Sequence, residues 1–142
     1  NLIGAYTQGL APNLIVSAGT AITADWIDSA GLHRGGFITP GIRLMQQALK
    51  DNTKIMRIEG PSDLCCEPAE DTENAIKRGT LYSVVAWIEY LAASTEQCLN
   101  TKIVPVLTGG DAVLLADRLK IPVVVKPELT LLGLAQLAEV QP

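Results

Sequence analysis

Residues 13–27 read NLIVSAGTAITADWI, and this stretch decides the fold. Two runs of strand-forming residues, Leu14–Val16 and Ala21–Ile27, flank a short corner with the sequence SAGT. Gly19 in that corner has no side chain and tolerates positive φ, so a ligand can approach the backbone closely. The hydroxyl residues around it and the consecutive N–H groups of a turn suit an anion. Taken alone, however, the stretch fits an ordinary hairpin with polar turn residues better than a ligand site.

Length and composition indicate one globular domain. The chain has 142 residues, of which 48% are hydrophobic and 18% are charged. Its formal net charge is −4 and its Lys and Arg residues do not gather into a stripe, so direct nucleic-acid binding is not expected. No apolar run reaches the roughly 20 residues of a membrane span, and no secretion signal opens the chain. We therefore expect a cytoplasmic protein without a membrane partner.

The cysteines do not form a recognisable framework. Cys65 and Cys66 are adjacent, Cys98 stands apart, and the single histidine is His33. An odd number with this spacing fits neither a disulfide pattern nor a common zinc site. We expect free thiols in a reducing compartment.

Hydrophobic periodicity and breaker residues predict an α/β fold. Beyond the two strands of the opening stretch, helices are expected at Asn1–Leu10, Gly41–Asp51, Glu73–Ala93, Ala112–Leu119 and Leu129–Val140, and strands at His33–Pro40, Lys102–Leu107 and Ile121–Val125. Thr53–Pro68 is expected to be irregular. Three antiparallel strands followed by alternating helices and strands predict a mixed sheet with helices on its faces.

The longest predicted helix, Glu73–Ala93, has apolar or small residues on more than one side. One face carries Ile76, Gly79, Ser83, Trp87 and Leu91, and another carries Leu81, Val85, Ile88 and Ala92. A helix of this kind is buried on more than one side. The second side is either a subunit interface or part of a central core, and the sequence favours neither.

Three glycine corners are candidates for a ligand site: Ala18-Gly19-Thr20, Gly35-Gly36 and Gly109-Gly110-Asp111. The third follows a buried strand and opens a helix, a junction where phosphorylated ligands bind in α/β proteins. Asp111 can also serve simply as the N-cap of that helix. Together the corners predict a phosphate-plus-nucleoside site along one rim of the sheet.

Four motifs in register resemble the type III pantothenate kinases and the related Bvg accessory factor proteins. They are Ser17-Ala18-Gly19-Thr20-Ala21-x-Thr23-x-Asp25, Gly35-Gly36-x-Ile38-x-Pro40-Gly41, Asp71-Thr72-x-x-Ala75-Ile76-x-x-Gly79 and Thr108-Gly109-Gly110-Asp111-Ala112. The resemblance implies the actin-like, acetate and sugar kinase fold, with residues 1–142 forming its C-terminal ribonuclease H-like domain. It also implies a homodimer, through the Glu73–Ala93 helix, that transfers the γ-phosphoryl group of ATP with Mg²⁺ to pantothenate, the first step towards coenzyme A.

The same resemblance assigns roles to individual residues. Gly19 and Thr20 contact the ATP phosphates, and Gly109, Gly110 and Asp111 lie by the nucleoside. Thr72 contacts pantothenate across the dimer interface, at the start of the long helix. The alternative for Thr72 is a helix N-cap.

Two departures from the family pattern matter. The N-terminal half of the family, which carries another phosphate motif and the catalytic Asp, has no counterpart in this sequence. We expect the chain to be an isolated C-terminal domain or one of two pieces of a cleaved protein. In either case it should be inactive without the other half, because phosphoryl transfer needs both walls of the cleft. Ser17 stands where the family has an Asp that helps to bind a monovalent cation (K⁺ or NH₄⁺). A neutral hydroxyl holds a hard cation less well, so weak potassium dependence or lost kinase activity is expected, and Asp25 is the nearest other acid of the motif.

Two other functions stay open. Ser17 favours a regulator like the Bvg accessory factors, described as transcriptional activators, with altered or lost kinase activity. A third possibility is a sugar-kinase-like domain that acts on another acceptor.

Overall fold

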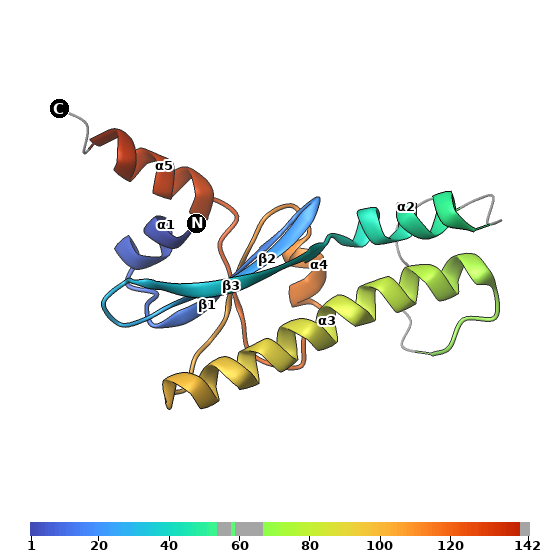
Figure 1. Ribbon diagram of the computed structural model, residues 1–142, viewed down its shortest axis with the longest axis horizontal. Helices are drawn as coiled ribbons and strands as arrows, with labels where there is room; N and C mark the ends of the chain where they lie inside the picture. Colours follow the sequence, from blue (N-terminus) through green and yellow to red (C-terminus); the bar gives the residue numbers. More distant parts are fainter. Residues whose placement is uncertain (54–57, 59–66, 140–142) are drawn as a thin grey trace.

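The computed structural model describes residues 1–53, 58 and 67–139 (Figure 1). Its elements are α1 (Leu2–Thr7), β1 (Asn13–Ala18), β2 (Ala21–Ile27), β3 (His33–Pro40), α2 (Ile42–Asn52), α3 (Thr72–Leu99), β4 (Val106–Thr108), α4 (Ala112–Ala116), β5 (Val124–Val125) and α5 (Leu129–Glu139). The order of helices and strands is the predicted one. The expectations for Cys65, Cys66 and most of 53–68 concern residues outside the described part of the chain.

The described strands form one five-stranded sheet in the order β3-β2-β1-β4-β5. The pairs β1–β2 and β2–β3 are antiparallel, whereas β1–β4 and β4–β5 are parallel. Strand β2 therefore runs against the other four. This order and direction are those of the ribonuclease H-like fold, which confirms the predicted fold class.

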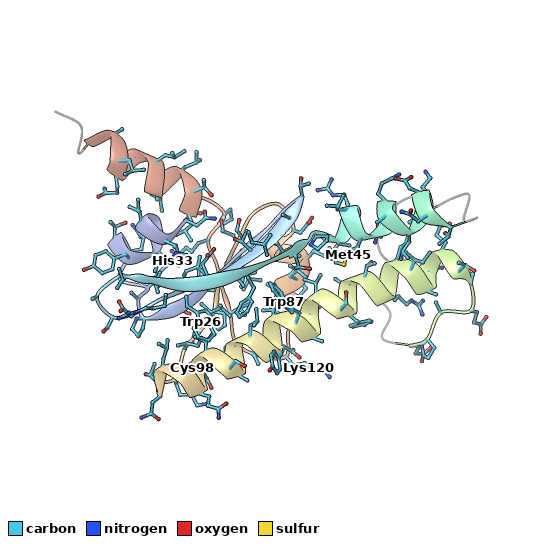
Figure 2. The ribbon with its side chains drawn as sticks, in the orientation of Figure 1. Trp26, His33, Met45, Trp87, Cys98 and Lys120 are labelled. Atoms are coloured by element: carbon cyan, nitrogen blue, oxygen red, sulfur yellow. The ribbon has the colours of Figure 1, made fainter. Side chains whose placement is uncertain are left out.

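Helices cover both faces of the sheet (Figure 1). Along β1, Leu14 and Val16 pack with residues of α3 and α4, whereas Ile15 packs with residues of α1 and α5. Successive residues of a strand point to opposite faces, so a strand covered on both sides is apolar throughout. The two tryptophans, Trp26 and Trp87, pack on the α3 side of the sheet (Figure 2).

Helix α3 is covered by the described chain on one side only. Its buried side carries Leu81, Val84, Val85, Ile88 and Ala92. The opposite side, with Gly79, Ser83, Ala86 and Tyr90, is exposed. Of the second face predicted from the sequence, Leu91 is buried and Trp87 packs against the core, whereas Gly79 and Ser83 stay exposed, so burial within the described chain accounts for that face only in part.

Proline and the helix cap explain where boundaries differ from the predicted ones. Strand β4 begins at Val106 and β5 at Val124, both later than predicted, because Pro105 and Pro122 have no N–H to donate to a ladder. Helix α3 continues to Leu99 and ends at Asn100, whose φ of 47° places it in the left-handed region typical of a helix end.

No helix in the described part of the chain is long and apolar enough to span a bilayer. Among the same residues, no group of three or more His, Cys, Asp or Glu side chains is placed to hold a metal ion. Cys98 is a free, exposed thiol.

Candidate functional site

The β1–β2 corner and the β4–α4 turn lie against each other at one edge of the sheet. The N–H of Asp111 donates a hydrogen bond of 3.2 Å to the carbonyl of Ala18. Gly109 has a φ of +92°, and a Cβ at this position would stand 2.3 Å from the same Ala18 carbonyl oxygen. Only glycine allows both the backbone conformation and the approach. The predicted convergence of these two corners is confirmed.

A third backbone segment joins this edge from the start of α2. The N–H of Gly41 donates to the carbonyl of Thr20 at 2.8 Å. A Cβ on Gly41 would stand 2.0 Å from the Gly19 carbonyl oxygen, so here too the two backbones touch. The sequence signal for this contact is the Pro40-Gly41 pair directly before a helix, which the three glycine corners do not include.

The prediction that Gly35-Gly36 forms another corner of the same rim is wrong. This pair lies inside β3, where Gly36 stands opposite Asp25. Asp25 is four residues along β2 from Ala21, about 13 Å at the usual rise of a strand. Its Oδ1 accepts a hydrogen bond of 2.9 Å from Nε2 of His33. The missing side chain of Gly36 leaves room for this carboxylate, because a Cβ there would lie 2.6 Å from Asp25 Oδ1.

Three hydroxyl residues form a row across the sheet next to the corner. Ser17 of β1 pairs with Thr23 of β2 and with Thr108 of β4. Directly paired residues point to the same face, so these side chains share the face covered by α1 and α5. Thr108 is fully buried and makes a long hydrogen bond of 3.4 Å to the Pro127 carbonyl. The row offers hydroxyl oxygens but no carboxylate to a cation.

Asp111 is the N-cap residue of α4, as the alternative to a ligand role predicted, but its side chain makes no capping hydrogen bond. The side chain is mostly buried, and its Oδ1 lies 3.7 Å from an Nη2 nitrogen of Arg43. The carboxylate is therefore not committed to capping α4. Arg43 was not singled out from the sequence, because a lone arginine on an exposed helix surface carries no pattern.

The edge has room for a ligand beside its backbone. A Cβ built on Gly110 meets nothing within 4 Å, and one on Gly19 meets only the Ala21 carbonyl oxygen at 3.9 Å. Thr20 is exposed, and so is Gly110. An exposed hydroxyl, two open glycines and a carboxylate that is not used for capping fit a nucleotide, whose phosphates and ribose need donors and acceptors respectively.

Thr72 lies far from this edge. It is the first residue of α3, a helix of 28 residues or about 42 Å, and the N-terminal end of α3 runs beside α2 away from the sheet (Figure 1). The cap is Asp71, whose Oδ1 accepts a hydrogen bond of 2.9 Å from the Asn74 N–H, so the N-cap alternative for Thr72 is wrong. That hydrogen bond lowers the pKa of Asp71.

A groove opens beside Thr72. It has a volume of about 450 Å³ and is lined by Leu49, Thr72, Ala75, Ile76, Gly79, Thr80 and Ser83. It therefore lies between α2 and α3, on the side of α3 that carries the exposed small residues. Its Ser83 end contacts Met45 near the start of α2, whereas Thr72 lies at the opposite end of the groove.

Comparison with known proteins identifies the family. Residues 1–94 match the family model described as type III pantothenate kinase. A type III pantothenate kinase of Ectopseudomonas mendocina (strain ymp) is 36% identical over 138 residues, which cover 94% of this chain and 55% of that protein. The one of Azoarcus sp. (strain BH72) is 39% identical over 137 residues, covering 96% and 51%. The chain thus spans about half the length of these relatives.

A solved structure supports the fold. The crystal structure of a conserved putative Baf family transcriptional activator from Campylobacter jejuni aligns with a TM-score of 0.69 and 23% identity, over 96% of this chain and 61% of that one. At this identity the likeness concerns the fold alone. The match to the family model covers well over half of the sequence, and on that ground the chain belongs to the type III pantothenate kinase family.

Proposed function

We propose that residues 1–142 form the C-terminal ribonuclease H-like domain of an ATP-dependent pantothenate kinase and supply one wall of its nucleotide site. The observation that carries this proposal is the hydrogen bond from Asp111 to Ala18, which joins two of the family's motifs at one edge. Family membership and the names of the relatives support the substrates, ATP and pantothenate.

At this edge the residues have distinct tasks. The hydroxyl of Thr20 and the N–H groups around Gly19 hold phosphate oxygens. Gly110 lets the nucleoside lie against the backbone, and Asp111 accepts hydrogen bonds from ribose hydroxyls or the base. Mg²⁺ reaches the site with the phosphates. Positioning and charge stabilisation dominate phosphoryl transfer, so a single wall binds its share of the nucleotide without catalysing the reaction.

The acceptor site and the dimer are parts of the same proposal. Pantothenate binds near Thr72, in the groove between α2 and α3. The exposed side of α3 packs against a second copy, which brings the groove of one chain towards the nucleotide site of its partner. Support comes from the position of Thr72 at the N-terminal end of α3, which runs beside α2 away from the sheet (Figure 1). The catalytic base comes from the N-terminal half, and the enzyme works in the cytoplasm.

Ser17 favours a second candidate, a regulator that keeps the fold with altered catalysis. The residue lies on the face of the sheet covered by α1 and α5 and gives a cation only a hydroxyl where the family pattern has a carboxylate. A regulator of this kind would bind its ligands without turning them over.

Coupled ATP turnover of the full-length protein, with and without pantothenate, tests the proposal. We expect ADP release that depends on pantothenate, and a phosphorylated product in the mass spectrum. Binding of ATP without turnover would support the regulator instead. Turnover that another acceptor stimulates and pantothenate does not would overturn the choice of substrate.

A further inference from the structure

We propose that Arg43 is a nucleotide-binding residue: its guanidinium pairs with Asp111 in the free protein and moves to the phosphates of ATP when the nucleotide binds. The inference rests on the proposed function and adds to it a residue that no motif contains. According to this proposal, the ion pair with Asp111 holds the Arg43 guanidinium near the site until the nucleotide binds.

The first argument is position. Arg43 lies in the first turn of α2, two residues after Gly41, whose N–H is bonded to the Thr20 carbonyl. The backbone of Arg43 is therefore held close to the β1–β2 corner. Its side chain reaches Asp111 on the β4–α4 turn, with 3.7 Å between Nη2 and Oδ1. The guanidinium thus spans the space between the two corners that would hold the phosphates and the nucleoside.

The second argument is that this ion pair does little for the fold. The Arg43 side chain is 83% exposed, and 3.7 Å is too long for a hydrogen bond. An exposed pair of this kind contributes little to stability. The first turn of α2 has no acidic residue, so the helix itself offers nothing to compensate a cation at the positive end of its dipole. A cation at the positive end of a helix dipole is locally unfavourable, and unfavourable features of this kind are expected at functional sites.

Arg34 shows what a structural arginine looks like in the same chain. Its Nε donates to Asp28 at 2.8 Å and its Nη2 lies 2.7 Å from the same oxygen, Oδ2. Backbone N–H donation from Leu32, with help from Arg34, lowers the pKa of Asp28. This pair fixes the β2–β3 turn at the other end of the sheet. Among the residues that the structure describes, the 3.7 Å approach to Asp111 is the ion pair that Arg43 makes, and so loose a contact leaves its side chain able to move to a better anion.

A triphosphate is that better anion. Arginine binds phosphate oxygens in a planar, two-pronged arrangement, which a single carboxylate oxygen at 3.7 Å does not provide. When the guanidinium leaves, the Asp111 carboxylate is released to accept hydrogen bonds from the ribose. Arg43 therefore gives the site a preference for phosphorylated nucleosides over unphosphorylated ones. Asp111 alone cannot give this preference, because it does not contact the phosphates.

Calorimetric titration of the full-length protein tests this exchange, with ATP measured directly and adenosine by competition. We expect Arg43→Gln to raise the Kd for ATP about tenfold or more, the usual scale for a lost charge-assisted contact. The Kd for adenosine should stay within about twofold, because adenosine has no phosphate. Arg43→Lys should fall between the two, and Arg34→Gln, the matched control at the other end of the sheet, should bind ATP like the wild type.

The outcomes separate the two levels of the proposal. If the wild type binds ATP and Arg43→Gln binds it equally well, the role of Arg43 is refuted and the proposed function stands. Equal weakening for ATP and adenosine, with a lower melting temperature, would mean a structural role and would also refute it. If the wild type binds no ATP at all, the proposed function itself fails.

Discussion

The backbone N–H of Asp111 lies 3.2 Å from the carbonyl oxygen of Ala18 and donates to it, so the turn after β4 is tied to the last residue of β1. The two residues are distant in sequence and belong to different motifs. The contact needs Gly109 between them, because no other residue combines its positive φ with so close an approach to Ala18. A set of predictions follows from this edge and from the exposed side of α3.

Gly109→Ala should destabilise the protein by more than about 2 kcal/mol, because a Cβ would both strain the backbone and collide with the Ala18 carbonyl. Gly110→Ala is the matched control for stability, since a Cβ there meets nothing within 4 Å. It should change the free energy of unfolding by no more than about 0.5 kcal/mol. Urea denaturation measures both. Equal stability of the two variants would show that the turn does not lie against β1.

Potassium should activate the full-length enzyme less than about twofold, because the row of Ser17, Thr23 and Thr108 contains no carboxylate. Ser17→Asp should introduce a clear potassium response. Initial rates at equal ionic strength, with K⁺ exchanged for a bulky organic cation, give the answer. Strong potassium activation of the wild type would contradict this assignment of Ser17.

Gly79 tests whether the exposed side of α3 is an interface. In one chain a Cβ on Gly79 meets nothing within 4 Å, so both Gly79→Ala and Gly79→Leu should leave the subunit folded and strengthen the helix by up to about 1 kcal/mol. If the α3 helices of two copies pack together, the leucine side chain should obstruct their close contact, whereas the smaller alanine side chain should obstruct it much less. Sedimentation should give a dimer for the wild type and dissociation for Gly79→Leu. A dimer that survives this change, or a monomeric wild type, would exclude the proposed interface.

Asp71 should make the start of α3 sensitive to pH. The Asn74 N–H lowers the pKa of Asp71 below that of the unfolded chain, so the charged form is the one the folded state favours. The resulting stability is fully present above the unfolded-state pKa and is lost as the pH falls through the folded-state value. Asp71→Ala should therefore melt earlier than the wild type at pH 7, by a margin that shrinks below about pH 4.

Asp71→Asn is the control for this pH effect, because it keeps a capping oxygen without a titrating group. Its advantage over Asp71→Ala should be the same at both pH values. A difference between wild type and Asp71→Ala that does not change with pH would show that the carboxylate charge does not contribute to the cap.

The sequence predicted the fold well where one residue type sets the local structure. The alternation around the SAGT corner predicted the hairpin, and the buried strand followed by Gly109-Gly110 predicted the second corner. The last two strands are shorter than expected because the prolines in the predicted ranges have no N–H to donate to the sheet. The apolar pattern that predicted these strands depends on side chains and carries no information about backbone donors.

The rest of the site depends on tertiary contacts that no local pattern encodes. Gly35-Gly36 looks like a turn, but β3 continues through it, with Gly36 opposite Asp25 at a place where a Cβ would collide with the Asp25 carboxylate. Arg43 becomes visible only when the fold brings Asp111 towards it. The cap of α3 could be assigned only from the Asn74 N–H, which selects Asp71 over the neighbouring Thr72.

Hydrogen–deuterium exchange of the full-length protein, with and without ATP and Mg²⁺, tests the central claim most directly. If the two corners form one wall of the nucleotide site, peptides covering 17–23 and 106–115 should become protected together when ATP binds. The peptides at the C-terminal end of α3, around Glu96 and Lys102, should not change. Protection confined to that end of α3, or to only one of the two corners, would contradict the account.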